Sequence, residues 1–534
     1  MPCSLAGLHG SSAAHPRPGI LVLIVAGIAG LGFGLRYATW QWGVELAQVS
    51  AGLVRYPPDA PAAALHGHLW SALDQITAML LRAGWSERAL SWTLSAIAGM
   101  LSAQALAMLT FALTRAVPPS LIVPLVLLPR DLTGFGVSYP VLLAGSPHTY
   151  GVLGLSISML ALGLVGSGWR RSGFVLAGLA IACQASTGAP VALALAAAGL
   201  VLRSPFEARD IRAIGTGLLL AAGSGAAFLL TRPAVQHVDA ATASRFLASF
   251  VSFWDGHRLP VPWRHRGVAI DLAVLALSIA WLWRPAAFPA RGAARLMVGA
   301  LAIAAAASVP LAMATWLDPA RLPNAVVAAM PGRLMNIGVF AAAPMLAALA
   351  WNALERIRTR HSTVATRHPV LVWPLVIAAA TWSLVLPAPR LIHEPATLRG
   401  ADDPVWALAS ARPGPLLTSA DIWLAQLRTR RPVLLDAATL DTLPYALDAG
   451  PRTEAILSDV YDQSLFAPPG DARGRGRASI RVNREAWTQR ESADWTRVRV
   501  AYGVTDVLTP ADWPLRLPVA AASPSLRLYA IPPR

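Results

Sequence analysis

The sequence of 534 residues has few charged residues, no lysine and almost no cysteine. Charged residues make up 13% of the chain, whereas soluble domains carry about 25%. The two cysteines, Cys3 and Cys183, lie in the N-terminal tail and in an apolar segment, so they indicate no disulfide framework. Walker A, GxSxG and HExxH motifs do not occur. The sequence therefore lacks the signatures of P-loop NTPases, nucleophile-elbow hydrolases and zinc metalloproteases.

Apolar sequence is abundant instead. Hydrophobic residues make up 55% of the chain, and the mean hydropathy is +0.51. Apolar runs recur at about the length that crosses a bilayer. This pattern predicts a membrane all-α protein with about eleven transmembrane helices, and the third is short and Pro-broken. The expected spans are 18–35, 90–113, 119–128, 150–165, 173–185, 189–202, 214–230, 268–283, 296–316, 334–354 and 370–386.

The basic residues predict the orientation of these spans. All 44 are arginines, the net charge is +16, and the pI is about 11.2. Such a pI is also typical of nucleic-acid-binding proteins, but these arginines gather in short loops between spans, as the positive-inside rule requires. No nucleic-acid partner is therefore expected. The run after Arg17 has no convincing small-x-small cleavage site, so we expect it to be retained as a first span with a cytoplasmic N-terminus.

With that orientation, the Arg-dense loops fall on the cytoplasmic side and the longer loops fall outside. The cytoplasmic loops are 170–171, 203–212, 284–295 and 356–360. The outer loops are 37–88, 130–148, 231–266 and 317–333. The longest acid-containing loop, 37–88, is expected to carry short helices that lie on the membrane and cover a site.

The composition changes after the last expected span. Residues 390–534 hold 18 Arg and 16 Asp or Glu, which is an ordinary balance for a soluble domain. Strand-like runs (PLLTS, RPVLLD, VTDVLTP, LRLYAIP) alternate with helix-like ones (DPVWALASA, SADIWLAQLRT, ESADWTRVRVAYG). The sequence thus predicts a transmembrane domain, 1–389, and an extracytoplasmic α/β domain, 390–534.

The first outer loop holds two candidate catalytic acids. Glu45, about ten residues beyond the first span, could act as a general base or ligate a divalent cation. It could equally be a solvated residue of an interfacial helix that Trp40 and Trp42 anchor. Asp59 lies in a Pro-flanked turn, where an acid also has a purely structural use. His66 and His68 resemble a metal pair only weakly, because no Cys or third close His completes a zinc pattern.

Two further outer segments carry candidate binding residues. In FWDGHR, Arg258 could clamp a phosphate while Asp255 positions it or ligates a metal, with His257 between them; alternatively the segment folds onto its own salt bridge. In MPGRLMN, Arg333 and Asn336 precede the tenth span. Arg333 could bind a lipid pyrophosphate or could extend to the headgroups of the bilayer.

Together these features resemble the GT-C glycosyltransferase superfamily of polytopic membrane enzymes. More narrowly, GVELAQVSAGLVRYPPDAP, PHTYGVLGLS, FWDGHR and MPGRLMN resemble a bacterial family of multipass membrane proteins without an assigned activity. The superfamily resemblance implies a catalytic acid in the first outer loop and a polyprenyl-phosphate sugar donor. No adjacent acidic pair, which is frequent in that superfamily, is present here; Glu45 and then Asp59 are the nearest matches.

The expected function is sugar transfer from a polyprenyl-phosphate donor at the outer face of a bacterial inner membrane. Glu45 or Asp59 would be the base, and Asp255 would position a group or ligate a metal. Arg258 and Arg333 would hold the phosphate, and His257 and Asn336 would also bind substrate. The acceptor would be a glycan, lipid or protein, and a divalent cation is an open possibility. The alternatives are a non-catalytic component of envelope polysaccharide assembly or export, and a secondary transporter. Polar residues are sparse in the span centres, which disfavours a transporter.

Overall fold

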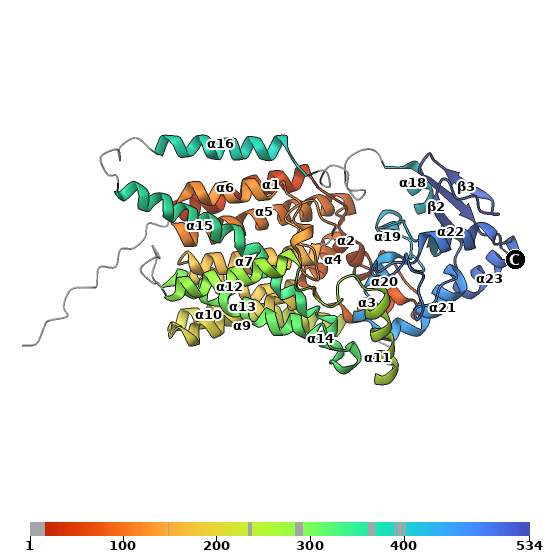
Figure 1. The fold of residues 1–534 in the computed structure, drawn as a ribbon. Helices are drawn as coiled ribbons and strands as arrows, with labels where there is room; N and C mark the ends of the chain where they lie inside the picture. The colour runs from red at the N-terminus through yellow and green to blue at the C-terminus, as the bar shows by residue number, and fades with distance from the viewer. Residues whose placement is uncertain are drawn as a thin grey trace, which may run out of the picture.

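The computed structural model describes residues 17–147, 149–204, 206–232, 238–283, 292–360, 369–388, 391, 398 and 402–533. Helices make up 67% of the described residues. Long helices lie side by side in a bundle, and the C-terminal residues form a smaller body at one end of it (Figure 1). Cys3 and parts of the expected loops at 130–148, 203–212, 231–266 and 284–295 lie outside the described residues.

Each of the eleven expected spans coincides with a helix. Six helices in the described part of the chain are long and apolar enough to cross a membrane, and four more are shorter apolar helices. A mostly helical protein with membrane-length helices is therefore confirmed. The helices are α1 (Arg17–Arg36), α5 (Glu87–Thr114), α6 (Val117–Leu127), α7 (Thr149–Gly166), α8 (Arg170–Cys183), α9 (Ala185–Val201), α10 (Ala208–Thr231), α12 (Arg266–Trp283), α13 (Ala293–Ala314), α15 (Asn336–Arg360) and α16 (Pro369–Val385).

Small residues let the central helices of the bundle approach closely. A Cβ atom on Gly30 of α1 would lie 2.3 Å from the carbonyl oxygen of Gly99 on α5, and one on Gly34 would lie 2.3 Å from that of Ser95. Such contacts allow the backbones to pack directly, which is how helices commonly associate in membranes. The third expected span forms an 11-residue helix, α6, that contains Pro124.

Short helices occupy the outer loops. The first loop forms α2 (Trp42–Ser50), α3 (Pro61–His68) and α4 (Ala72–Arg82), between the bundle and the C-terminal body (Figure 1). The Ser71 hydroxyl accepts a hydrogen bond from the Leu73 amide and so caps α4. The remaining outer elements are η1 (Thr133–Phe135), α11 (Ala240–Ser249), η2 (Phe250–Trp254), η4 (Pro319–Arg321), α14 (Asn324–Ala328) and η5 (Pro331–Met335).

The C-terminal body contains a mixed four-stranded sheet with the order β1-β2-β4-β3. Strand β1 pairs in parallel with β2, and β4 pairs antiparallel with both β2 and β3. This confirms a small C-terminal sheet. Its strands are β1 (Leu416–Thr418), β2 (Asp506–Pro510), β3 (Val519–Ala522) and β4 (Leu526–Ala530). The helices are α18 (Pro404–Ser410), α19 (Ala425–Thr429), α20 (Ala437–Asp441), η7 (Leu443–Tyr445), η8 (Leu447–Ala449), α21 (Gly450–Tyr461), α22 (Ile480–Gln489) and α23 (Ser492–Tyr502).

An outer loop of the bundle contributes to the core of the C-terminal body. Phe246, Phe250 and Trp254, on α11 and η2, pack with the buried residues of 417–531. Trp254 is fully buried, and its indole nitrogen donates to the Leu465 carbonyl oxygen at 2.7 Å. The amide of Gly476 in turn donates to the Trp254 carbonyl oxygen at 2.7 Å. This core therefore draws residues from both sides of the expected domain boundary at residue 390.

Candidate functional site

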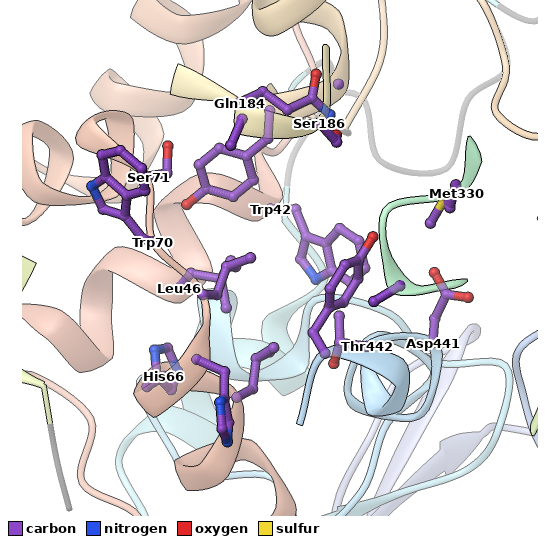
Figure 2. A pocket seen from close by; sticks show the side chains of 18 of the residues that line it. Trp42, Leu46, His66, Trp70, Ser71, Gln184, Ser186, Met330, Asp441 and Thr442 are labelled. Carbon is purple, nitrogen blue, oxygen red and sulfur yellow. The ribbon is translucent and has the colours of Figure 1, made fainter. Parts of the chain in front are cut away.

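A cavity of about 640 Å³ lies where the bundle meets the C-terminal body. Most of its lining comes from four segments: the first outer loop, the junction of α8 and α9, the segment from α14 to η5, and residues 426–445 of the C-terminal body. Tyr139, the start of α7 and His257 complete it. Figure 2 shows the labelled side chains of Trp70, Ser71 and Leu46 on one side, those of Asp441 and Thr442 on the other, and that of Trp42 between them. The cavity volume is in the range of small-molecule binding sites.

The walls of this cavity differ in polarity. The first outer loop and the α14–η5 segment supply all the large apolar side chains, Trp42, Leu46, Leu65, Leu69, Trp70 and Met330. The lining residues of the C-terminal body all carry polar side chains, Gln426, Asp436, Thr439, Asp441, Thr442 and Tyr445. An amphiphilic ligand fits such a pair of walls, because its apolar part avoids water on one side while its polar part finds hydrogen-bond partners on the other.

Glu45, predicted as a base, lines the cavity from α2 and is 4% exposed. Its Oε1 accepts a hydrogen bond from the Leu427 amide at 3.3 Å. Its backbone carbonyl accepts from the Gln426 side chain at 2.7 Å. Burial, reinforced by the negative charge of Asp436, raises the pKa of Glu45 well above the ordinary 4.5. The carboxyl group thus lies at the contact between the first loop and the C-terminal body, where burial favours its protonated form.

Asp59, the other predicted base, does not line this cavity. Its side chain is 54% exposed and pairs with Arg452 of the C-terminal body at 2.9 Å. A second link of the same kind joins His68 to Asp448 at 2.9 Å. Asp59 therefore lies at the rim of the contact between the first outer loop and the C-terminal body, outside the cavity.

Asp255 and Arg258 form a buried ion pair directly behind the cavity wall. Arg258 Nη1 and Asp255 Oδ2 are 2.5 Å apart, and both side chains are at most 1% exposed. The Arg258 guanidinium also donates to the carbonyl oxygens of Val327 at 3.1 Å and Ala328 at 3.2 Å. Neither residue lines the cavity, whereas His257 between them does. The segment therefore folds onto its own salt bridge and fixes the lining residues of α14.

Arg333 lines the cavity and has no carboxylate partner within the described residues. It is 9% exposed. One Nη donates to the Ser186 hydroxyl at 2.9 Å, and the other contacts Met330 Sδ at 2.8 Å. The guanidinium lies 4.5 Å from the centre of the Tyr139 ring. Its Nε makes no hydrogen bond in the described structure. A buried arginine that forms no salt bridge among the described residues is well suited to bind an anionic ligand.

The first turn of α9 borders the same space as Arg333. Gln184, Ala185 and Ser186 line the cavity at the point where α9 begins. The amides of a first helical turn lack intrahelical partners, and the helix dipole favours negative charge there. Arg333 and the start of α9 consequently make one positive region in a cavity whose other charged side chains include Glu45, Asp436 and Asp441.

Asn336, the remaining predicted binding residue, forms hydrogen bonds with the backbone of a neighbouring loop. Its Oδ1 accepts from the Val137 amide at 2.8 Å, and its Nδ2 donates to the carbonyl oxygens of Val137 at 3.2 Å and Tyr139 at 2.9 Å. These three bonds fix the loop that carries Tyr139, the ring beneath the Arg333 guanidinium. Asn336 thereby positions Arg333 indirectly and does not line the cavity.

Sequence reasoning missed the two acids that the C-terminal body contributes, Asp436 and Asp441. Burial raises the pKa of Asp441, although His257, Arg258 and Arg333 oppose this shift. The missed signal was the run RPVLLDAATLD, in which acids directly follow an apolar stretch. Within the described residues, no group of three His, Cys, Asp or Glu side chains is arranged to hold a metal ion. The polar groups that line the cavity are carboxyl, hydroxyl, amide, imidazole, indole, thiol and guanidinium groups.

No family model matches the chain, and no curated protein matches it significantly. The function has to be argued from the cavity and its residues.

Proposed function

We propose that this chain is a membrane glycosyltransferase that takes a sugar from a polyprenyl-phosphate donor and acts in the cavity between the bundle and the C-terminal body. The observation that carries the proposal is the composition of the cavity: an apolar wall, an arginine that forms no salt bridge among the described residues, and buried carboxyl groups face one space. A polyprenyl-phosphate sugar has the three matching parts, an apolar chain, an anionic group and a polyhydroxyl group.

The placement in the membrane follows from the helices and the arginines. We take all eleven apolar helices as spans, with the N-terminus in the cytoplasm and the Arg-dense short loops on the cytoplasmic side. The first outer loop and the C-terminal body then lie outside, at the outer face of a bacterial inner membrane. In that arrangement the cavity is at the height of the lipid headgroups, where an amphiphilic donor resides.

Donor binding would use the wall that the bundle supports. Arg333 and the first turn of α9 would hold the phosphate, because a guanidinium and free helix amides both donate to phosphate oxygens. The side chains of Leu46, Leu65 and Trp70 would contact the first isoprene units. Arg258 would act at a distance, by fixing α14 and so the wall beside Met330.

The transfer step requires a base and a stabilised leaving group. The acceptor hydroxyl would give its proton to the Glu45 carboxylate while its oxygen attacks the anomeric carbon of the sugar. The bond from that carbon to the phosphate oxygen would break, and the phosphate would leave with the electron pair towards Arg333. The direction of the pKa shift supports this role, because a carboxylate with a raised pKa accepts a proton more readily than one with the ordinary pKa of 4.5.

The test compares Glu45→Gln with Asp59→Asn in membranes that contain a labelled polyprenyl-phosphate hexose and the native acceptors. Glu45→Gln should lower transfer by about 10²–10⁴-fold, with an unchanged amount of folded protein. Asp59→Asn, in the same loop but outside the cavity, should transfer normally. Full activity of Glu45→Gln would refute its role as the base. Donor binding by the wild type without any transfer would instead favour a non-catalytic assembly component.

A further inference from the structure

The C-terminal wall of the cavity carries hydrogen-bonding groups only. Its lining residues are two acids, one amide, two threonines and one tyrosine, Asp436, Asp441, Gln426, Thr439, Thr442 and Tyr445. This wall comes from α19, α20 and η7, which are short elements of the C-terminal body. Carboxyl, amide and hydroxyl groups pair with the hydroxyls of a sugar, and none of these six side chains is a cation.

The position of Asp441 is set by its surroundings. Gly476 has a positive φ of 62°, and a Cβ atom there would lie 2.7 Å from Asp441 Oδ1. The absence of a side chain at this position leaves room for the carboxyl group. Figure 2 shows the Asp441 side chain beside Thr442 and facing the segment of Met330. Asp441 therefore lies across the cavity from the bundle-side wall, close to the electrostatic influence of Arg333 and His257.

Besides Arg333, the basic side chains that line the cavity are His66, His68 and His257, and His257 already interacts electrostatically with Asp441. Arg333 is the one arginine among the lining residues. Arg258 behind the wall is already paired with Asp255 at 2.5 Å. Burial lowers the pKa of His66 to about 4, so this side chain is neutral at pH 7. His68 faces Asp448 at 2.9 Å. Three carboxyl groups, those of Glu45, Asp436 and Asp441, border the remaining space.

We propose that the wall of Gln426, Asp436, Thr439, Asp441, Thr442 and Tyr445 binds the sugar of the donor and selects sugars that carry no negative charge. This inference rests on the proposed function, since it assigns the polar end of the same cavity. With Arg333 engaged by the phosphate, a sugar carboxylate would lie among carboxyl groups without a counter-ion. Burial of a charged carboxylate without a cation beside it costs far more than burial of a hydroxyl that forms hydrogen bonds in the same place.

The experiment measures the binding of two matched probes to the full-length protein in lipid nanodiscs at pH 7. One probe is a polyprenyl phosphate that carries glucose, and the other is the same lipid carrying glucuronic acid. The wild type should bind the glucose probe at least about tenfold more tightly. In Asp441→Asn and in Asp436→Asn this ratio should fall at least about threefold, because one carboxyl group is replaced by a neutral amide of equal size.

The control variant is Asp512→Asn, an exposed acid of the same body that pairs with Arg484 and is 63% exposed. It should keep the wild-type ratio, and unchanged melting temperatures should show that all variants fold. Equal binding of the two probes, or a ratio that neither cavity variant changes, would overturn the charge selection alone. Failure of the wild type to bind either probe or sugar-free polyprenyl phosphate would overturn the proposed function as well.

Discussion

The two walls of the cavity come from parts of the chain with opposite character. The bundle-side wall uses residues next to the apolar helices and presents tryptophan, leucine and one arginine. The C-terminal wall uses residues of a body with a nearly balanced charge and presents only polar side chains. Neither wall encloses a site alone. An amphiphilic site can thus be divided between an apolar helical bundle, which offers apolar surface, and a C-terminal body of balanced charge, which offers hydrogen bonds.

Replacing Arg333 with Gln alters the bundle-side wall alone and should have the largest effect. Loss of the one lining arginine removes the charge that would hold the phosphate. Transfer and binding of sugar-free polyprenyl phosphate should both fall by about 10²-fold or more. Arg321→Gln, an exposed arginine of the same outer loop, is the matched control. Equal lipid binding by Arg333→Gln and the wild type would show that the phosphate does not bind at this wall.

Replacing Trp254 with Ala should loosen the connection between the walls. Truncation of a fully buried tryptophan costs about 3–5 kcal/mol, and here the Leu465 carbonyl also loses its 2.7 Å hydrogen bond. Limited proteolysis should cut the C-terminal body much faster than in the wild type. Trp263→Ala serves as the control, since that side chain is 45% exposed in the same loop. Wild-type resistance of Trp254→Ala would show that the C-terminal core does not depend on η2.

Glu45 should make the contact between the walls sensitive to pH. Its pKa in the folded protein is raised above the ordinary 4.5. The folded state therefore holds the proton more tightly, and the stability that Glu45 contributes is complete below pH 4.5 and is lost as the pH rises through the raised pKa. Glu45→Gln stays neutral, so at pH 8 it should melt about 2 °C higher than the wild type.

Glu87 serves as a control for this experiment, because its pKa is shifted in the opposite direction to that of Glu45. Burial alone would raise its pKa, but hydrogen bonds from Arg430, at 2.6 and 2.9 Å, and from Gln48 outweigh burial and lower it. Its contribution is present above the unfolded pKa and is lost as the pH falls. Glu87→Gln should therefore melt below the wild type at pH 8. A Glu45→Gln protein that also melts lower at pH 8 would contradict the assigned direction.

The smallest effect is expected at the rim. Asp59 and Arg452 are 54% and 34% exposed, and exposed ion pairs contribute about 0–1 kcal/mol. Arg452→Gln should leave transfer within about twofold of the wild type and shift the melting temperature little. If Arg452→Gln lost as much activity as Arg333→Gln, the active site would have to lie at the rim and not in the cavity.

Much of the fold could be read from the sequence. Apolar runs report burial in lipid or protein directly, so all eleven expected segments are helices. The runs PLLTS, VTDVLTP and LRLYAIP contain β1, β2 and β4. RPVLLD was the exception: Val433 makes only an isolated bridge to Leu416, and the apolar residues of this run are buried beneath the cavity wall. Local sequence patterns thus predict which residues are buried better than they predict whether those residues form a strand, a helix or a loop.

The candidate site was harder to predict, because it depends on contacts between distant segments. Glu45, His257 and Arg333 were singled out and do line one cavity. Asp436 and Asp441 were not, since nothing in the sequence near residue 440 shows that this segment faces residue 45. Trp254 likewise gives no local sign that it belongs to the core of the C-terminal body. Such pairings arise from the tertiary fold and leave no periodic pattern.

Cryo-electron microscopy of the full-length protein with added polyprenyl phosphate would show directly whether this lipid binds in the cavity between the bundle and the C-terminal body. We expect density for the lipid inside the cavity, with its phosphate against the Arg333 guanidinium and the start of α9. The isoprenoid chain should lie along Leu46, Leu65 and Trp70. Lipid density confined to the outer surface of the bundle, with the cavity empty at saturating lipid, would contradict it.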